Sequence, residues 1–237
     1  MSTPEQLFAD LLGTAGSRPF VTYYDGASGE RSELSARSLG NWVAKTHFLL
    51  VDELGLGRGD SAFVALPPHW ISVPAILGCL TAGLAFTDSG AADVAFVSPG
   101  TLADAAGVPD IYAVAPSAAA AGFGASGPDG AADYVAAVRP QADVWATVRF
   151  GAGDDDPCLA GRTRGEVVRW ARQRAAQLGI QHGGRVISTR DWATSDDLVD
   201  TLLAPLAVGG SVVYVRNCTE EATLERWMNQ ERATLRI

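Results

Sequence analysis

Residues 61–82 read SAFVALPPHWISVPAILGCLTA, and this stretch decides the expected fold. A short apolar run at 61–66 is stopped by two prolines, and an apolar segment of helical length follows at about 70–82. Further apolar runs at 94–97 and 111–115 flank a short helical pattern near Leu102. Strands and helices that alternate at these lengths predict an α/β fold with mostly parallel sheets flanked by helices.

The preceding residues predict a helix, a hairpin and a second helix. Thr3 caps a helix that ends near residue 13, and a strand at 20–24 runs into a tight turn. Ser35 caps the next helix, whose leucines and aromatic residues fall on one side. Lys45, the only lysine among 18 lysine and arginine residues, is expected on the opposite, solvated side.

The second half repeats the alternation of strands and helices. Strands are expected at 145–150, near 159, at 185–189, at 211–215 and from 234 onward; helices are expected at 165–178, 195–207 and 219–232. Residues 116–130, rich in alanine and glycine, predict a surface loop or a subdomain boundary within a single domain spanning 1–237.

Composition excludes several kinds of partner. The net charge of −9 repels phosphate backbones and anionic lipid headgroups, so no nucleic acid and no membrane surface is expected as a partner. No basic leader precedes an apolar run, and the longest apolar run is interrupted by Pro74, so we expect a cytoplasmic protein. The three cysteines are widely spaced, which favours reduced thiols over a zinc site, and no metal is expected.

Seven segments carry a resemblance that covers nearly the whole chain. They are residues 32–44, 54–60 (LGLGRGD), 64–68 (VALPP), 75–83 (AILGCLTAG), 166–168, 184–188 and 202–213 (LLAPLAVGGSVV). In order and spacing they resemble the amino-terminal region of adenylate-forming enzymes, which include AMP-dependent acyl-CoA synthetases, luciferases and peptide-synthetase adenylation domains. The resemblance implies the fold of that region and a truncated, degenerate member of the superfamily.

The family's phosphate loop is the main point of difference. That loop is a Ser/Thr/Gly-rich turn ending Pro-Lys-Gly, whose backbone N–H groups and lysine hold ATP phosphates. Its counterpart here, CLAGRTRG at 158–165, is shorter and has neither that run nor a lysine. Arg162, Thr163 and Arg164 are the candidate phosphate or anion contacts, because guanidinium groups stay charged and donate paired hydrogen bonds. They can equally be solvated residues at the start of a helix.

Three other patterns in the sequence resemble ligand sites. Asp191 and Trp192 follow an expected strand, where doubly wound sheets place their ligand crevice, and are candidate pocket-lining residues; Trp192 can equally fill structural space. GFGASG at 122–127 matches a dinucleotide fingerprint but lacks the leading strand, so a loop is expected. The acidic run 154–156 lacks calcium-loop spacing and predicts a solvated turn.

These observations favour a non-catalytic relative of acyl-CoA synthetases that acts as a binding or scaffold protein. No residue is assigned a catalytic role, because the family's Tyr-Gly-x-Thr-Glu motif, hinge aspartate and catalytic lysine would lie beyond Ile237. The alternative is a carboxylate-activating enzyme, forming an acyl-adenylate, that a separate polypeptide completes. No cofactor is expected under the first hypothesis, whereas ATP or AMP is expected under the second. A homodimer or a protein partner covering the truncated edge is also expected.

Overall fold

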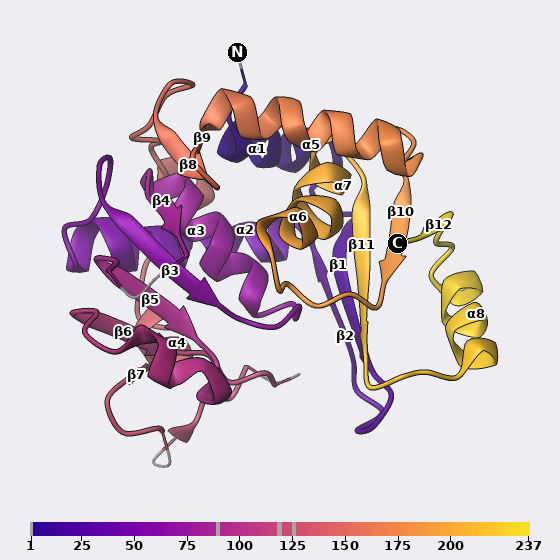
Figure 1. Cartoon of the computed structure of the whole chain (residues 1–237), viewed down its shortest axis with the longest axis horizontal. Helices are drawn as coiled ribbons and strands as arrows, with labels where there is room; N and C mark the ends of the chain where they lie inside the picture. Colours follow the sequence, from indigo (N-terminus) through magenta and orange to yellow (C-terminus); the bar gives the residue numbers. More distant parts are fainter. Residues whose placement is uncertain (1, 89–90, 118–119, 125–126) are drawn as a thin grey trace. The chain divides into compact units, whose positions relative to one another are not determined.

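The computed structural model describes residues 2–88, 91–117, 120–124 and 127–237 (Figure 1). The chain forms two compact units: Met1–Ser38 with Gly165–Ile237 make up unit 1, and Leu39–Arg164 make up unit 2. Each unit contains one five-stranded sheet, so the α/β fold with mostly parallel sheets is confirmed. The predicted subdomain boundary at 116–130 stays a prediction.

The sheet of unit 1 has the strand order β12-β10-β11-β1-β2. Its strands are β1 (Pro19–Asp25), β2 (Arg31–Ser35), β10 (Arg185–Ser188), β11 (Ser211–Arg216) and β12 (Leu235–Arg236). All neighbours run parallel except the β1–β2 hairpin, and β1 and β11 pair with Val21 opposite Val212. The strand expected from residue 234 is confirmed as β12.

Helices complete unit 1. They are α1 (Pro4–Ala15), α5 (Arg164–Leu178), α6 (Ser195–Leu198), α7 (Ala204–Ala207) and α8 (Glu221–Gln230), with a π-helix, η5 (Val199–Leu203), between α6 and α7. On the side of the sheet that α8 covers, Tyr24, Ile187, Val213 and Val215 pack with Leu224 of α8. This apolar contact anchors α8.

The expected helix at 195–207 is interrupted by η5, and its cap is Thr194 rather than Ser195. The Thr194 side chain accepts from Asp197 N, and Asp197 accepts in return, which completes a capping box. In α7, Pro205 has no backbone N–H and therefore cannot donate a helical hydrogen bond to the carbonyl of Thr201. The Tyr214 hydroxyl donates to that carbonyl over 3.1 Å instead, so the buried acceptor is satisfied.

The sheet of unit 2 is entirely parallel, in the order β4-β3-β5-β6-β7. Its strands are β3 (Ser61–Ala65), β4 (Ala85–Thr87), β5 (Val94–Val97), β6 (Asp110–Ala113) and β7 (Ala132–Asp133). The helices are α2 (Ala36–Phe48), the π-helix η1 (Leu49–Glu53), α3 (Ser72–Ala82), α4 (Tyr134–Val138) and two 3-10 helices, η2 (Pro99–Ala105) and η4 (Trp145–Thr147). A separate hairpin joins β8 (Pro157–Leu159) to β9 (Arg162–Thr163).

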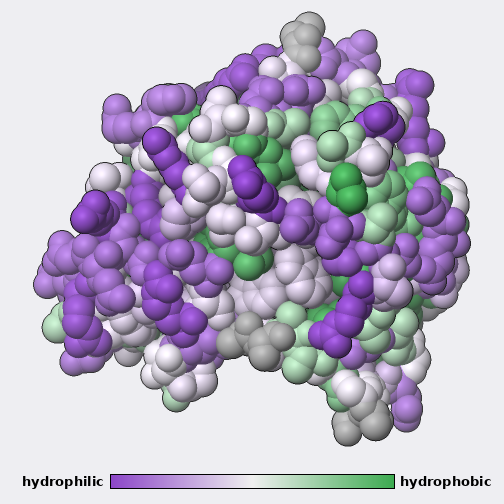
Figure 2. Space-filling view, turned by 180° about the vertical axis from the view of Figure 1, so that it is seen from behind, coloured by the Kyte–Doolittle hydropathy of each residue, from purple (hydrophilic) through white to green (hydrophobic). Residues whose placement is uncertain are grey.

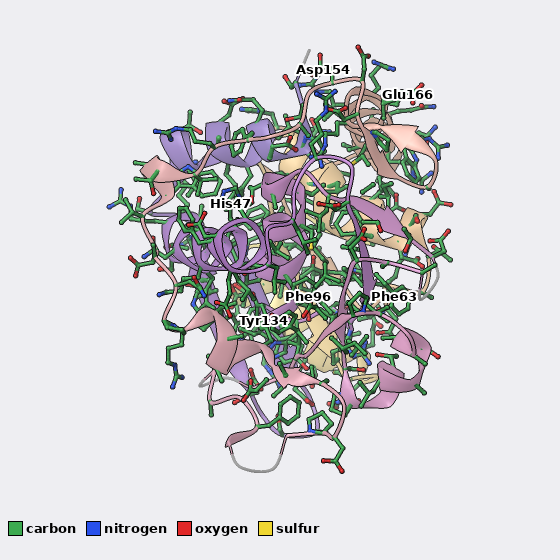
Figure 3. All side chains as sticks on the ribbon, turned by 90° about the vertical axis from the view of Figure 1, so that its left-hand side faces the viewer. His47, Phe63, Phe96, Tyr134, Asp154 and Glu166 are labelled. Carbon is green, nitrogen blue, oxygen red and sulfur yellow. The ribbon has the colours of Figure 1, made fainter. Side chains whose placement is uncertain are left out.

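Helices α2 and α3 approach each other closely at Gly78. A Cβ atom on Gly78 would lie 2.4 Å from Cγ2 of Thr46, so the contact requires glycine. The Thr46 hydroxyl shares a buried 2.7 Å hydrogen bond with the Tyr134 hydroxyl, and the Tyr134 ring meets Phe96 edge-on at 5.7 Å (Figure 3). These contacts join α2, α3, α4 and β5 in one core.

Two predictions for unit 2 were wrong. The aromatic segment 145–150 is not a strand: it holds the short η4, and its Trp145 and Phe150 rings pack against each other at 6.1 Å. Lys45 is half-buried rather than solvated, because its Nζ donates to the carbonyls of Arg139 and Gln141 over 3.1 and 2.7 Å. The single lysine therefore stabilises the end of α4, consistent with a cation near helix carboxyl ends.

The surface seen in Figure 2 is mostly hydrophilic, and its hydrophobic residues lie in small separate groups. Within the described ranges, every helix is too short or too polar to cross a membrane.

Candidate functional site

The counterpart of the family's phosphate loop is a hairpin with a turn of two residues. Leu159 of β8 pairs with Arg162 of β9, and only Ala160 and Gly161 connect them. Both have positive φ, 52° and 70°, as two-residue type I′ hairpin turns require. A backbone cradle for phosphates needs several successive N–H groups that converge on the anion. A two-residue turn is too short to surround a triphosphate in that way.

Arg164 lies inside unit 2. Its side chain is fully buried, and its two Nη atoms donate hydrogen bonds of 2.9 Å to the carbonyls of Leu80 and Leu84. Leu80 is in the last turn of α3, which Gly83 ends in a left-handed conformation. The guanidinium thus satisfies carbonyls at a helix end, where a positive charge is favourable. The structure leaves Arg164 no exposed surface on which to meet an anion.

The two neighbouring candidates lie on β9. Arg162 is exposed and Thr163 is half-buried, so either side chain can reach solvent from the hairpin. A phosphate or anion contact at Arg162 and Thr163 stays a prediction.

The acidic turn before this hairpin is held by hydrogen bonds. Asp156 accepts from the Gly153 N–H over 2.7 Å and from Arg58 Nε over 2.9 Å. The hydrogen bond from the Gly153 N–H has the largest effect on Asp156 and lowers its pKa. The hydrogen bond from Arg58 lowers that pKa further. Among the residues that the structure describes, no three His, Cys, Asp or Glu side chains are grouped as a metal site.

The GFGASG segment at 122–127 lies only partly within the described residues. Two of its residues, 125 and 126, lie outside the described part of the chain. The loop expected for this segment therefore stays a prediction.

The other predicted pair, Asp191 and Trp192, follows β10 in unit 1. The Trp192 indole donates to Thr201 Oγ1 over 2.8 Å and meets the Tyr214 ring edge-on at 5.4 Å. Trp192 therefore packs against the end of the sheet in its own unit. Asp191 is exposed, forms an ion pair with Arg216 and lines a cavity.

This cavity has a volume of about 490 Å³ and lies at the carboxyl ends of three adjacent parallel strands, β12, β10 and β11. It is lined by Thr189, Asp191, Val215, Arg216, Asn217, Cys218, Thr219, Leu224 and Arg236. We call it the strand-end cavity. Sequence reasoning missed Arg216 and Arg236, although each stands at the end of an expected strand, which is where such sheets place ligands.

An ion network around the buried carboxylate of Asp200 holds the loop that carries Asp191. Asp200, in η5, accepts from Arg174 Nε at 2.6 Å and Arg174 Nη2 at 2.7 Å. Arg190 Nη1 donates to the same carboxylate over 3.0 Å. Because Asp200 is buried and Arg190 immediately precedes Asp191, the network fixes one wall of the strand-end cavity.

Similarity to a known protein shows which family this chain belongs to. No protein-family model matches it. A Mycobacterium tuberculosis protein described as a TIGR03089 family protein is 40% identical over an alignment of 235 residues, which covers 96% of this chain and 93% of the relative. The chain belongs to the TIGR03089 family. That name states no activity.

Solved structures similar to this TIGR03089 family chain include acyl-CoA synthetases. The Brucella canis acyl-CoA synthetase matches with a TM-score of 0.78 at 16% identity, over 99% of this chain and 47% of that one. The acetoacetyl-CoA synthetase from Streptomyces lividans matches with a TM-score of 0.77 at 17% identity, over 99% and 42%. This confirms the resemblance to adenylate-forming enzymes at the level of the fold. The chain spans less than half the length of these two proteins.

Proposed function

We propose that this chain is a non-catalytic relative of the acyl-CoA synthetases that serves as a binding protein. The observation that carries the proposal is the two-residue turn between Leu159 and Arg162, which stands where the resemblance expects a phosphate loop. Neither buried Arg164 nor Lys45 compensates for the short turn, since each donates to backbone carbonyls of unit 2. ATP phosphates would therefore find few positive groups at this turn.

The alternative is a carboxylate-activating enzyme that a separate polypeptide completes. It is supported by the match to the acyl-CoA synthetase fold over 99% of this chain and by the exposure of Arg162 beside the turn. In this case ATP is the cofactor, and Arg162 and Thr163 contact its phosphates.

Pyrophosphate exchange with ATP and a panel of carboxylic acids separates the two proposals. The binding-protein proposal expects no exchange above a protein-free blank, with a full-length acyl-CoA synthetase as positive control. It also expects that any heat of ATP titration, with or without candidate partner polypeptides, is unchanged in Arg162→Gln. ATP binding that Arg162→Gln weakens, together with exchange, would establish the enzyme instead.

We also propose a protein partner or a second copy of the chain at strand β12. This strand is an edge of the unit 1 sheet, and an edge strand offers backbone groups for pairing. Sedimentation velocity at high concentration tests self-association, and a monomer at every concentration would restrict the proposal to another protein. A cytoplasmic location completes the proposal and is supported by three free cysteines.

A further inference from the structure

We propose that the strand-end cavity of unit 1 binds a small anionic molecule, whose carboxylate or phosphate group is held by Arg216 and Arg236. The inference rests on the proposed binding function and names the site and the class of ligand. Both arginines line the cavity, and guanidinium groups bind carboxylate and phosphate with paired, charge-assisted hydrogen bonds.

The two arginines have partners that a ligand can replace. Arg216 pairs with Asp191, and Arg236 Nη1 lies 2.5 Å from Glu221 Oε1. The side chains of Asp191 and Glu221 are 61% and 63% exposed, so both acids become hydrated again when they are displaced. Exposed ion pairs contribute little stability, and an incoming oxyanion therefore displaces them at small cost.

Arginines that serve only structure are paired differently in the same unit. Arg174 holds the Asp200 carboxylate, whose side chain is 2% exposed, through two hydrogen bonds. Arg185 Nη2 similarly lies 2.8 Å from buried Glu231. Removing either of these buried acids would leave an arginine charge without its partner, whereas the acids paired with Arg216 and Arg236 are themselves largely exposed. The exposed pairs are therefore the ones available to a ligand.

The N-terminus of α8 and two threonine hydroxyls lie beside the strand-end cavity. Helix α8 begins at Glu221, two residues after cavity-lining Thr219, and its N-cap Glu220 makes no side-chain capping bond. The first N–H groups of a helix and its dipole favour negative charge. The hydroxyls of Thr189 and Thr219, which also line the cavity, are further donors.

The apolar part of the ligand is expected to be short. Val215 and Leu224 form the apolar lining of the strand-end cavity. A much smaller neighbouring cavity, of about 20 Å³, shares Thr189, Leu224 and Arg236 with it. Its other lining residues are Ile187, Met228, Glu221 and Glu225. This space accommodates about one water-sized group, so a compact ligand fits better than a long acyl chain.

Calorimetry on the full chain tests the inference. The probes are acetate, butyrate, octanoate, inorganic phosphate and methyl phosphate, with 1-butanol as the uncharged counterpart of butyrate. We expect at least one anion to bind and 1-butanol not to bind. The probes that bind show whether the anionic group of the ligand is a carboxylate or a phosphate. Octanoate is expected to bind no more tightly than butyrate.

Four variants locate the site. Arg216→Gln and Arg236→Gln should each weaken binding by roughly tenfold or more, because each removes a charged hydrogen-bond donor. Asp191→Asn should leave the affinity unchanged or raise it, since it removes a competing anion. Arg172→Gln, on the exposed surface of α5, is the matched control and should change nothing. Thermal melts confirm that each variant is folded.

The inference is overturned if no probe binds the wild-type chain or Asp191→Asn at millimolar concentration. It is also overturned if folded Arg216→Gln and Arg236→Gln both bind as tightly as the wild type. Neither result affects the proposed absence of catalysis, which pyrophosphate exchange measures separately.

Discussion

The guanidinium of Arg164 reaches the carbonyl oxygen of Leu80 over 2.9 Å, although 84 positions separate the two residues in the chain. A second Nη atom reaches Leu84 over the same distance. The segment after the β8–β9 hairpin is thereby attached to the end of α3 within unit 2.

Replacing Arg164 by Met should therefore destabilise the protein. The substitution removes two buried charge-assisted hydrogen bonds, which costs on the order of 3 kcal/mol, although the Leu80 carbonyl still accepts from the Gly83 N–H over 3.1 Å. Urea denaturation measures the free energy of unfolding. Arg162→Met, on the exposed strand β9, is the control and should change that free energy by less than about 0.5 kcal/mol. Equal stability of the two variants would contradict the role given to Arg164.

The turn residue Ala160 offers a second test. Its φ of 52° is unfavourable for alanine but common for asparagine, so Ala160→Asn should stabilise the chain by roughly 0.5 kcal/mol. Ala160→Val should destabilise it by about 1 kcal/mol or more, because β-branched residues avoid this conformation. Thermal unfolding of the two variants measures the order of their stabilities. A Val variant more stable than the Asn variant would contradict the turn geometry.

Asp200→Asn should destabilise unit 1 by about 3 kcal/mol, because Arg174 and Arg190 both lose a charged partner in a buried setting. The exposed neighbour Asp196→Asn is the control. A double-mutant cycle with Arg174→Met measures the coupling, which should exceed about 1 kcal/mol. Independent effects of the two substitutions would show that the pair does not act as a unit.

The stability of the chain should depend on pH through His47. Burial lowers the pKa of His47 below its ordinary value of 6.5, despite the opposing effect of Asp52. The unfolded chain therefore takes up a proton before the folded chain does, and stability falls as pH decreases from 6.5 toward the folded pKa. The pKa of Glu231 is also lowered, so the protonation of Glu231 reduces the stability of the fold only below about pH 4.5. Burial raises this pKa, but hydrogen bonds from Tyr24, Arg31 and Arg185 outweigh that effect.

Urea titrations at pH 7 and pH 5 check this dependence. The loss of stability between the two values should be smaller in His47→Gln than in the wild type. His182→Gln, at an exposed position, is the control. An unchanged difference in His47→Gln would show that another group titrates in this range.

The sequence predicted the parallel strands well because their apolar runs are bounded by clear turn residues. Val94–Val97 matched in full, and Arg185–Ser188 differed by one residue. The strands β4 and β7 have only three and two residues, too few for any periodicity to be seen. The segment 145–150 has the composition of a strand, but its aromatic rings pack locally instead.

The site was less predictable because it depends on contacts between distant parts of the chain. Nothing near Arg164 in the sequence shows that its guanidinium reaches the carbonyls of Leu80 and Leu84, so the burial of Arg164 could not be foreseen. Asp191 was identified from its place after a strand. Arg236 joins it in the strand-end cavity only because β12 pairs with β10, a long-range pairing that no local pattern encodes.

The pairing of β1 with β11 has a consequence for synthesis on the ribosome. The centre of the unit 1 sheet, where Val21 pairs with Val212, cannot form until Val212 has left the ribosome. Unit 2 lies between these two residues in the sequence as one uninterrupted segment. Translation therefore allows residues 39–164 to acquire their structure while the first 38 remain unfinished. Chaperones that recognise nascent apolar segments would be expected to meet β1 during this interval.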